Sequence, residues 1–170
     1  MLDDLVKQTK VVAGTSTIVA KVGVGVAVKK GEPKPDIGSA DTFKKTMLAA
    51  KSIVYTKESQ TSAVLISVVD RLGIVAEMTP KTILETSSSA TAQNVANGKA
   101  EIGFILISEI LPAPGIELAG PLPAELQRYV VFTAGIGATS KDTAAARAFI
   151  EFLKSPVAAP ALKANGMEPV

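Results

Sequence analysis

The stretch SIVYTKESQTSAVLISVVDRL, residues 52–72, decides the fold of this chain. Its apolar start, residues 52–55, ends in seven polar residues, and apolar residues then return at intervals of three and four up to Leu72. This pattern predicts a buried strand, a polar turn and a helix with one buried face. Open α/β sheets bind ligands at such turns, because the free N–H groups and the positive dipole end of the helix face outward there. The turn therefore indicates a site for an anion or polar solute.

A second strand–turn–helix pattern follows at residues 82–95, where ILET precedes SSSATAQNV. We expect Ser88, Ser89 or Thr91 to cap this helix, because short hydroxyl side chains accept bonds from the first free N–H groups. Asn97 and Gly98 are expected to end it, since both tolerate positive φ. Two hydroxyl-rich helix starts in one small domain predict a shared binding face.

The rest of the chain continues to alternate strands and helices. Further helices are expected over residues 2–8, 39–50 and 140–153, and further strands over residues 22–28, 101–107, 116–118 and 129–135. The strand EIGFILI, residues 101–107, is nearly all apolar and is therefore expected at the centre of the sheet. The side chains expected to pack inward are Phe43, Met47 and Leu48 of one helix and Ala144, Ala145, Ala148, Phe149 and Phe152 of another. The alternation predicts a three-layer α/β/α fold with a mostly parallel sheet.

Composition limits the function. With 170 residues and 47% apolar content, the chain makes one domain, or one complete lobe with a partial second. The net charge of +2 comes from scattered residues, which argues against nucleic acid as a partner. The sequence has no Cys and no His, so disulfides, thiolate or histidine metal sites and imidazole catalysis are excluded. We expect no enzyme activity, no metal and no cofactor.

Three segments resemble one known family: VANGKAEIGFILISEIL (residues 95–111), YVVFTAGIGATSKDTAAARAFIEFLKSP (residues 129–156) and LKANGMEPV (residues 162–170). They resemble the type II periplasmic solute-binding proteins of ABC transporters, most closely the molybdate-binding branch. The resemblance implies two lobes joined by two crossing strands, VGVGVAV and YVVFTAG, with a small oxyanion or polar anion held between the lobes. It also implies ABC transporter membrane subunits as partners and a periplasmic location.

The resemblance assigns residues 1–28 and 127–170 to the first lobe and residues 29–126 to an inserted second lobe. It places Ser62 and Val95 at helix starts whose N–H groups point at the ligand. The ligand-binding set expected on these grounds is Thr56, Ser59, Thr61, Ser62, Ala63, Asn94 and Val95. Two departures from the molybdate binders weaken the case for molybdate itself: Leu106 replaces a tyrosine, and Thr61 replaces a proline.

In the family, a further part of the first lobe and an export signal precede the segment MLDDLVK. We therefore expect this chain to be a fragment or a truncated product with half a binding site, cytoplasmic if Met1 is its natural start.

Three other interpretations remain open. The serines and threonines could be helix caps alone. The incomplete first lobe could expose apolar faces and form a strand-exchanged homo-oligomer. The chain could also be the effector-binding domain of a transcription regulator.

Overall fold

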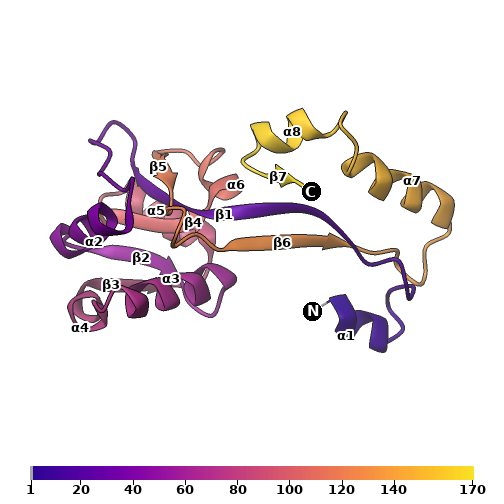
Figure 1. Cartoon of the computed structure of the whole chain (residues 1–170), viewed down its shortest axis with the longest axis horizontal. Helices are drawn as coiled ribbons and strands as arrows, with labels where there is room; N and C mark the ends of the chain where they lie inside the picture. Colours follow the sequence, from indigo (N-terminus) through magenta and orange to yellow (C-terminus); the bar gives the residue numbers. More distant parts are fainter. Residues whose placement is uncertain (1) are drawn as a thin grey trace. The chain divides into compact units, whose positions relative to one another are not determined.

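The computed structural model describes residues 2–170, which divide into two compact units (Figure 1). One unit comprises residues 23–130. The other combines the two ends of the chain, up to Val22 and from Val131 onward. Two strands, β1 (Thr17–Lys29) and β6 (Tyr129–Ala134), pass through both boundaries and pair with each other. The chain therefore passes from one unit to the other twice, along paired strands.

The unit of residues 23–130 is built on a sheet of order β3-β2-β4-β1-β5. Its other strands are β2 (Ile53–Thr56), β3 (Thr82–Glu85), β4 (Ile102–Leu106) and β5 (Ile116–Pro121). β3, β2 and β4 are parallel, whereas β1 runs antiparallel to both β4 and β5. The predicted α/β fold and the central place of β4 are confirmed, and the antiparallel part of the sheet comes from the crossing strand β1.

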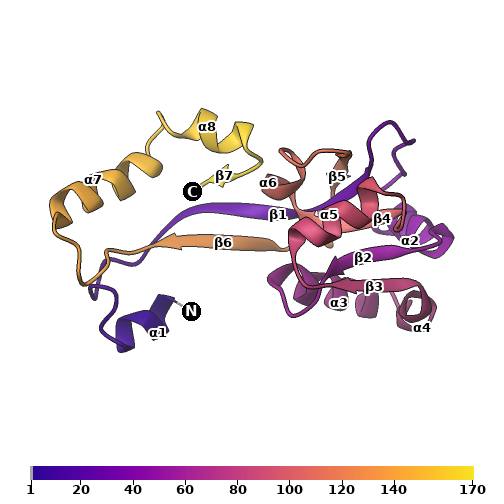
Figure 2. The same ribbon diagram turned by 180° about the vertical axis from the view of Figure 1, so that it is seen from behind.

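Helices cover both faces of this sheet (Figures 1 and 2). They are α2 (Ala40–Ala49), α3 (Gln60–Arg71), α4 (Val75–Met78) with the 3₁₀ turn η1 (Thr79–Lys81), α5 (Ser88–Ala96) and α6 (Ile107–Ile110). Alternate residues of β2 belong to different cores: Ile53 packs with Leu65 of α3, and Val54 packs with Val95 of α5. Because strand side chains alternate between faces, both faces of the sheet are buried and the predicted three layers are present.

The unit of the chain ends contains α1 (Leu2–Lys7), α7 (Thr143–Leu153), α8 (Ala159–Ala164) and β7 (Glu168–Pro169). β7 pairs with β1 at Ala20 and Lys21. β1 begins at Thr17, five residues before the strand predicted over residues 22–28. α7 begins at Thr143, three residues after the start of the helix predicted over residues 140–153, and Asp142 caps it, since its side chain accepts from the N–H of Ala145.

The buried face predicted for α7 is wrong. The side chains of Phe149 and Phe152 are 60% and 50% exposed, and Ile150 is the buried residue of the helix. Ala144, Ala145 and Ala148 are exposed as well. The apolar pattern is real, but no element that the structure describes in this unit covers that face. On α2 the buried face is confirmed at Phe43 and Met47, whereas Leu48 is 40% exposed and was wrongly assigned to that face.

Candidate functional site

The polar turns found in the sequence meet at the carboxyl end of β2. The chain runs from β2 through α3 to β3, and then through α5 past β2 to β4. Since α3 and α5 cover opposite faces of the sheet, both helices begin beside the end of β2. A hydrogen bond of 3.1 Å between the hydroxyls of Thr56 and Thr91 joins the two helix starts. This is a topological switch point, the place where open α/β sheets bind ligands.

The first turn of α3 is held by a reciprocal cap. Ser59 Oγ accepts from the N–H of Ser62 at 3.0 Å, and Ser62 Oγ accepts from the N–H of Ser59 at 2.9 Å. Each hydroxyl also donates its proton: Ser59 to Thr56 O and Ser62 to Ser59 O, both at 2.7 Å. Neither serine therefore keeps a free proton for a bound anion, so both shape the turn as capping residues.

Thr61 differs from its serine neighbours. The residue is only 7% exposed, and its hydroxyl makes no hydrogen bond among residues 2–170; since no buried polar side-chain atom of these residues lacks a partner, that hydroxyl is open to the surface. The N–H groups of Gln60 and Thr61 precede the first intrahelical donor, Ala63, whose N–H bonds Ser59 O at 3.1 Å. They belong to the N–H groups that a helix leaves without internal acceptors. The start of α3 thus offers a hydroxyl and free N–H donors at the positive end of the helix dipole.

The start of α5 is capped one residue earlier than expected. Ser87, not Ser88, Ser89 or Thr91, accepts from the N–H of Ala90 at 3.1 Å. The hydroxyl of buried Thr91 donates to Ser87 O. The residue that links the two helix starts, Thr91, is therefore one that the sequence suggested only as a cap. The spacing of Ser87 and Thr91 in the sequence was the feature that could have indicated this role.

Three of the expected site residues do not present free donors at this edge. Val95 is fully buried in the last turn of α5, so the expectation that its N–H lies at a helix start is wrong. Asn94 is also past the first turn, and its side chain donates to Glu85 Oε1 at 2.7 Å and Ala90 O at 2.9 Å. Ala63 is exposed, but its N–H is used inside α3. Thr56, Ser59, Thr61 and Ser62 are the predicted residues brought together.

Glu85 is the acidic side chain fixed beside this edge. It ends β3 opposite Thr56 in the parallel register, and its main-chain oxygen accepts from the N–H of Lys57 at 2.9 Å.

The described residues contain no cluster of acidic side chains suited to a metal ion. None of the helices in residues 2–170 has the length and hydropathy needed to cross a bilayer. The donors described above, the Thr61 hydroxyl and the first N–H groups of α3, are neutral groups that suit oxygen-rich anions.

Comparisons with known proteins agree with this architecture. Residues 1–168 match the family model for bacterial extracellular solute-binding proteins. The chain is 31% identical over 178 residues to aconitate isomerase of a Pseudomonas species, covering 99% of this chain and 64% of that protein. It is 29% identical over 122 residues to the molybdate-binding protein ModA of Rhodobacter capsulatus, covering 72% of this chain and 48% of that protein. The chain thus spans less than two thirds of the length of these curated relatives.

Two solved structures share the fold. One is the substrate-binding domain assigned to a molybdenum ABC transporter of Clostridium difficile, with a TM-score of 0.77 and 18% identity, covering 99% of this chain and 72% of that chain. The other is the periplasmic molybdate-binding protein of Azotobacter vinelandii, with a TM-score of 0.74 and 20% identity, covering 98% and 73%.

Proposed function

This chain belongs to the bacterial extracellular solute-binding protein family, and on that premise we propose that the start of α3 contributes part of a receptor site for a small oxygen-rich anion. The observation that carries the proposal is the hydroxyl of Thr61, which makes no hydrogen bond among the described residues although the residue as a whole is only 7% exposed. No buried side-chain oxygen or nitrogen of the described residues lacks a partner, so the Thr61 hydroxyl reaches the surface at the start of α3, where a ligand can contact it. A bound anion would accept its hydrogen bond.

Neutral donors would hold the anion. The hydroxyl of Thr61 and the first N–H groups of α3 would donate to its oxygens, while Ser59 and Ser62 keep those groups in place. Hydrogen bonds to an ionised acceptor are about twice as strong as neutral ones, so a few fixed donors suffice. Leu106 brings no hydroxyl to the end of β4, which favours an anion larger or chemically different from molybdate.

The relatives support this class of ligand without naming it. One relative is named for molybdate binding and another for an isomerase of aconitate, a carboxylate. Both ligands are anions with several oxygen atoms. We further propose that the two units are the two lobes of the receptor, that the whole protein works outside the cytoplasm, and that it delivers its anion to ABC transporter membrane subunits.

Isothermal titration calorimetry with molybdate, tungstate, sulfate, phosphate, citrate and both isomers of aconitate tests the proposal. We expect at least one anion to bind saturably, and the variant Thr61→Val to bind it at least tenfold more weakly. Thr82→Val is the matched control, because Thr82 donates to Met78 O at the opposite end of β3. Absence of saturable binding to any of the anions, or equal losses in both variants, would reject the site.

An enzyme is the second candidate, favoured by the 31% identity to aconitate isomerase over 99% of the chain. A proton shift within a bound carboxylate would need a base, and Glu85 is the nearest fixed carboxylate described above. Ultraviolet absorbance distinguishes the candidates, since the two aconitate isomers absorb differently. Conversion that stops in Glu85→Gln but not in Glu77→Gln would establish the enzyme; binding without conversion supports the receptor.

A further inference from the structure

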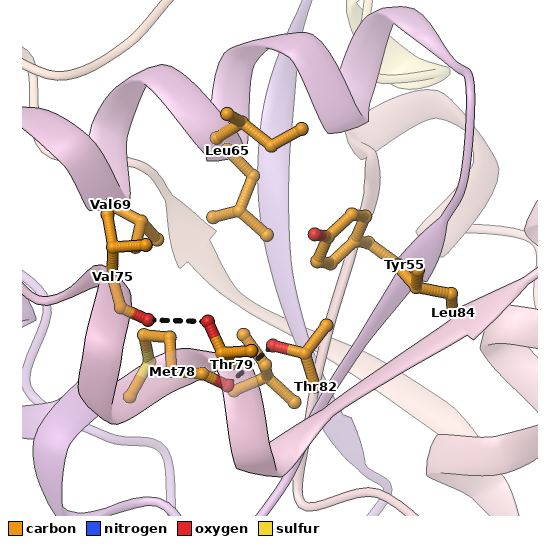
Figure 3. Close-up of a pocket in the computed structure, with 10 residues that line it drawn as sticks. Tyr55, Leu65, Val69, Val75, Met78, Thr79, Thr82 and Leu84 are labelled. Atoms are coloured by element: carbon orange, nitrogen blue, oxygen red, sulfur yellow. Dashed lines mark hydrogen bonds between the residues drawn. The ribbon is translucent and has the colours of Figure 1, made fainter.

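A cavity of about 300 Å³ lies on the α3 face of the sheet, away from the polar helix starts (Figure 3). Its walls come from the later turns of α3, from α4 and from η1, and its floor comes from β2 and β3. Leu65, Val69 and Met78 line it with buried apolar side chains. The volume falls at the lower end of the range of small-molecule sites.

The polar groups in this cavity are few, and only one has an unused proton. Thr79 donates its hydroxyl proton to Val75 O, and Thr82 donates to Met78 O, both at 2.8 Å. The hydroxyl of Tyr55 points into the space between Leu65 and Thr82, as Figure 3 shows, and has no partner in the described part of the chain. Burial raises the pKa of Tyr55, so the phenol stays protonated at neutral pH and can donate.

The lining also determines what can enter. No charged side chain is among the residues that line the cavity. An ion would lose its hydration there without a compensating partner, so an ionised ligand is disfavoured. The rim of the cavity is formed by Leu84 of β3, the edge strand of the sheet, together with Val75 of α4 and Ile66 of α3. Leu84 is 55% exposed, and the other two side chains are exposed as well. An apolar molecule therefore has an open path from solvent to the Tyr55 hydroxyl.

We propose that this cavity binds a small uncharged molecule with an aromatic or branched aliphatic body and one carbonyl oxygen, which accepts the hydrogen bond of Tyr55. The site is separate from the proposed anion site, although both use α3. Its ligand is recognised by apolar contact and a single neutral hydrogen bond, whereas the anion site offers N–H and hydroxyl donors at a helix start.

Acetophenone and ethylbenzene form a matched pair of probes, because they have similar shapes and only acetophenone has a carbonyl. Both are titrated into the whole chain carrying labelled Ile, Leu, Val and Met methyl groups, and binding is followed by NMR. We expect saturable shifts at the methyl groups of Leu65, Val69 and Met78. Tyr55→Phe should weaken acetophenone three- to tenfold, the range of one neutral hydrogen bond, and leave ethylbenzene unchanged.

Two further variants make the test decisive. Tyr129→Phe, at the only other tyrosine of the sequence, should bind both probes as the unaltered chain does. Val75→Trp, at the exposed rim, should block both probes while the methyl spectrum of the core stays dispersed. Shifts of equal size at exposed methyl groups far from the cavity lining, such as those of Leu111 and Val157, would overturn the proposal. So would an equal loss of both probes in Tyr55→Phe, or dilution-dependent shifts at these methyl groups without any probe, which would assign the cavity to a second copy of the chain.

Discussion

Lys81 ties the end of α2 to the start of β3 through one ammonium group. Its Nζ donates to three main-chain oxygens, those of Met47 at 3.1 Å, Leu48 at 2.7 Å and Ala50 at 2.8 Å. These carbonyls belong to the last turn of α2, where intrahelical donors are lacking and a positive charge is favoured. The side chain thus performs the role of a C-terminal cap from a distant part of the sequence.

Replacing Lys81 with Met should lower the free energy of unfolding by about 2 kcal/mol, since hydrogen bonds from a charged donor contribute roughly 1.5–3 kcal/mol. Urea denaturation followed by circular dichroism measures the change. Lys45→Met is the matched control, because Lys45 is an exposed residue of the same helix. A loss of equal size in both variants would mean that Lys81 acts only through its general charge.

Gly103 lets α5 approach the centre of the sheet. A Cβ at this position would lie 2.6 Å from Val95 Cγ2, closer than side chains pack. Gly103→Ala should therefore destabilise the fold by about 1–3 kcal/mol, the usual cost of overpacking. Adding Val95→Ala should restore part of that loss, which a double-mutant cycle in urea measures. Gly137→Ala is the control, since nothing lies within 4 Å there. Strict additivity of the two core changes would contradict the close contact.

Glu125 should make stability depend on pH. Hydrogen bonds from its own backbone N–H and from that of Ala40 lower the pKa of its carboxyl below the ordinary 4.5, and the charge of Arg71 adds to the effect. A folded-state pKa below the unfolded value gives stability that is present above 4.5 and is lost as pH falls through the folded pKa. Glu125→Gln should be less stable than the unaltered chain at pH 7, and the difference should vanish in acid. Urea midpoints between pH 2 and pH 7 test this, and a constant difference would refute it.

At the scale of elements, α7 shows what apolar periodicity does and does not tell. The exposed face of α7, formed by Phe149 and Phe152, follows the same spacing as the buried face of α3. Periodicity identifies which side of a helix is apolar, because side chains repeat every 3.6 residues. It does not identify whether another element covers that side. The burial of β2 and β4 was easier to predict. Their short runs are apolar on both sides, and both faces of these strands are buried.

The two phenylalanines of α7 should contribute little to stability in this chain. Phe149→Ser combined with Phe152→Ser should change the free energy of unfolding by less than about 1 kcal/mol and reduce self-association, because both side chains are half exposed or more. Ile150→Ala should cost about 2 kcal/mol or more, since that side chain is 8% exposed. Thermal denaturation and light scattering measure both effects. A large loss in the serine variant would show that this face is covered in solution.

The candidate site was predictable as a place but not in its details. Strand–turn–helix patterns pointed to the end of β2, because that geometry follows from residue type and spacing. Which hydroxyl keeps its proton does not follow from them: Ser59 and Thr61 look alike in sequence, yet one is used in the cap and the other is free. Val95 was misplaced because the resemblance aligned it with a helix start, whereas α5 begins seven residues earlier, at Ser88.

At the scale of the whole molecule, apolar burial is uneven between the two units. Both hydrophobic clusters that the structure describes lie within residues 23–130. The unit of the chain ends buries a smaller set, chiefly Ala20, Val22, Ile136, Ile150 and Ala158. Since buried apolar area is the main source of stability, the two units should differ in their resistance to opening.

Amide hydrogen exchange on the whole chain should therefore show two classes. Amides of β2 and β4 are expected to exchange only when the whole unit unfolds, because both strands are buried on both faces. Amides of α7 should exchange orders of magnitude faster, since one buried isoleucine holds that helix. Mass spectrometry of peptic fragments over seconds to hours resolves the difference. Equal protection of α7 and β4 in dilute solution would contradict the uneven burial. Protection of α7 that rises with protein concentration would instead assign its exposed face to contact between copies of the chain.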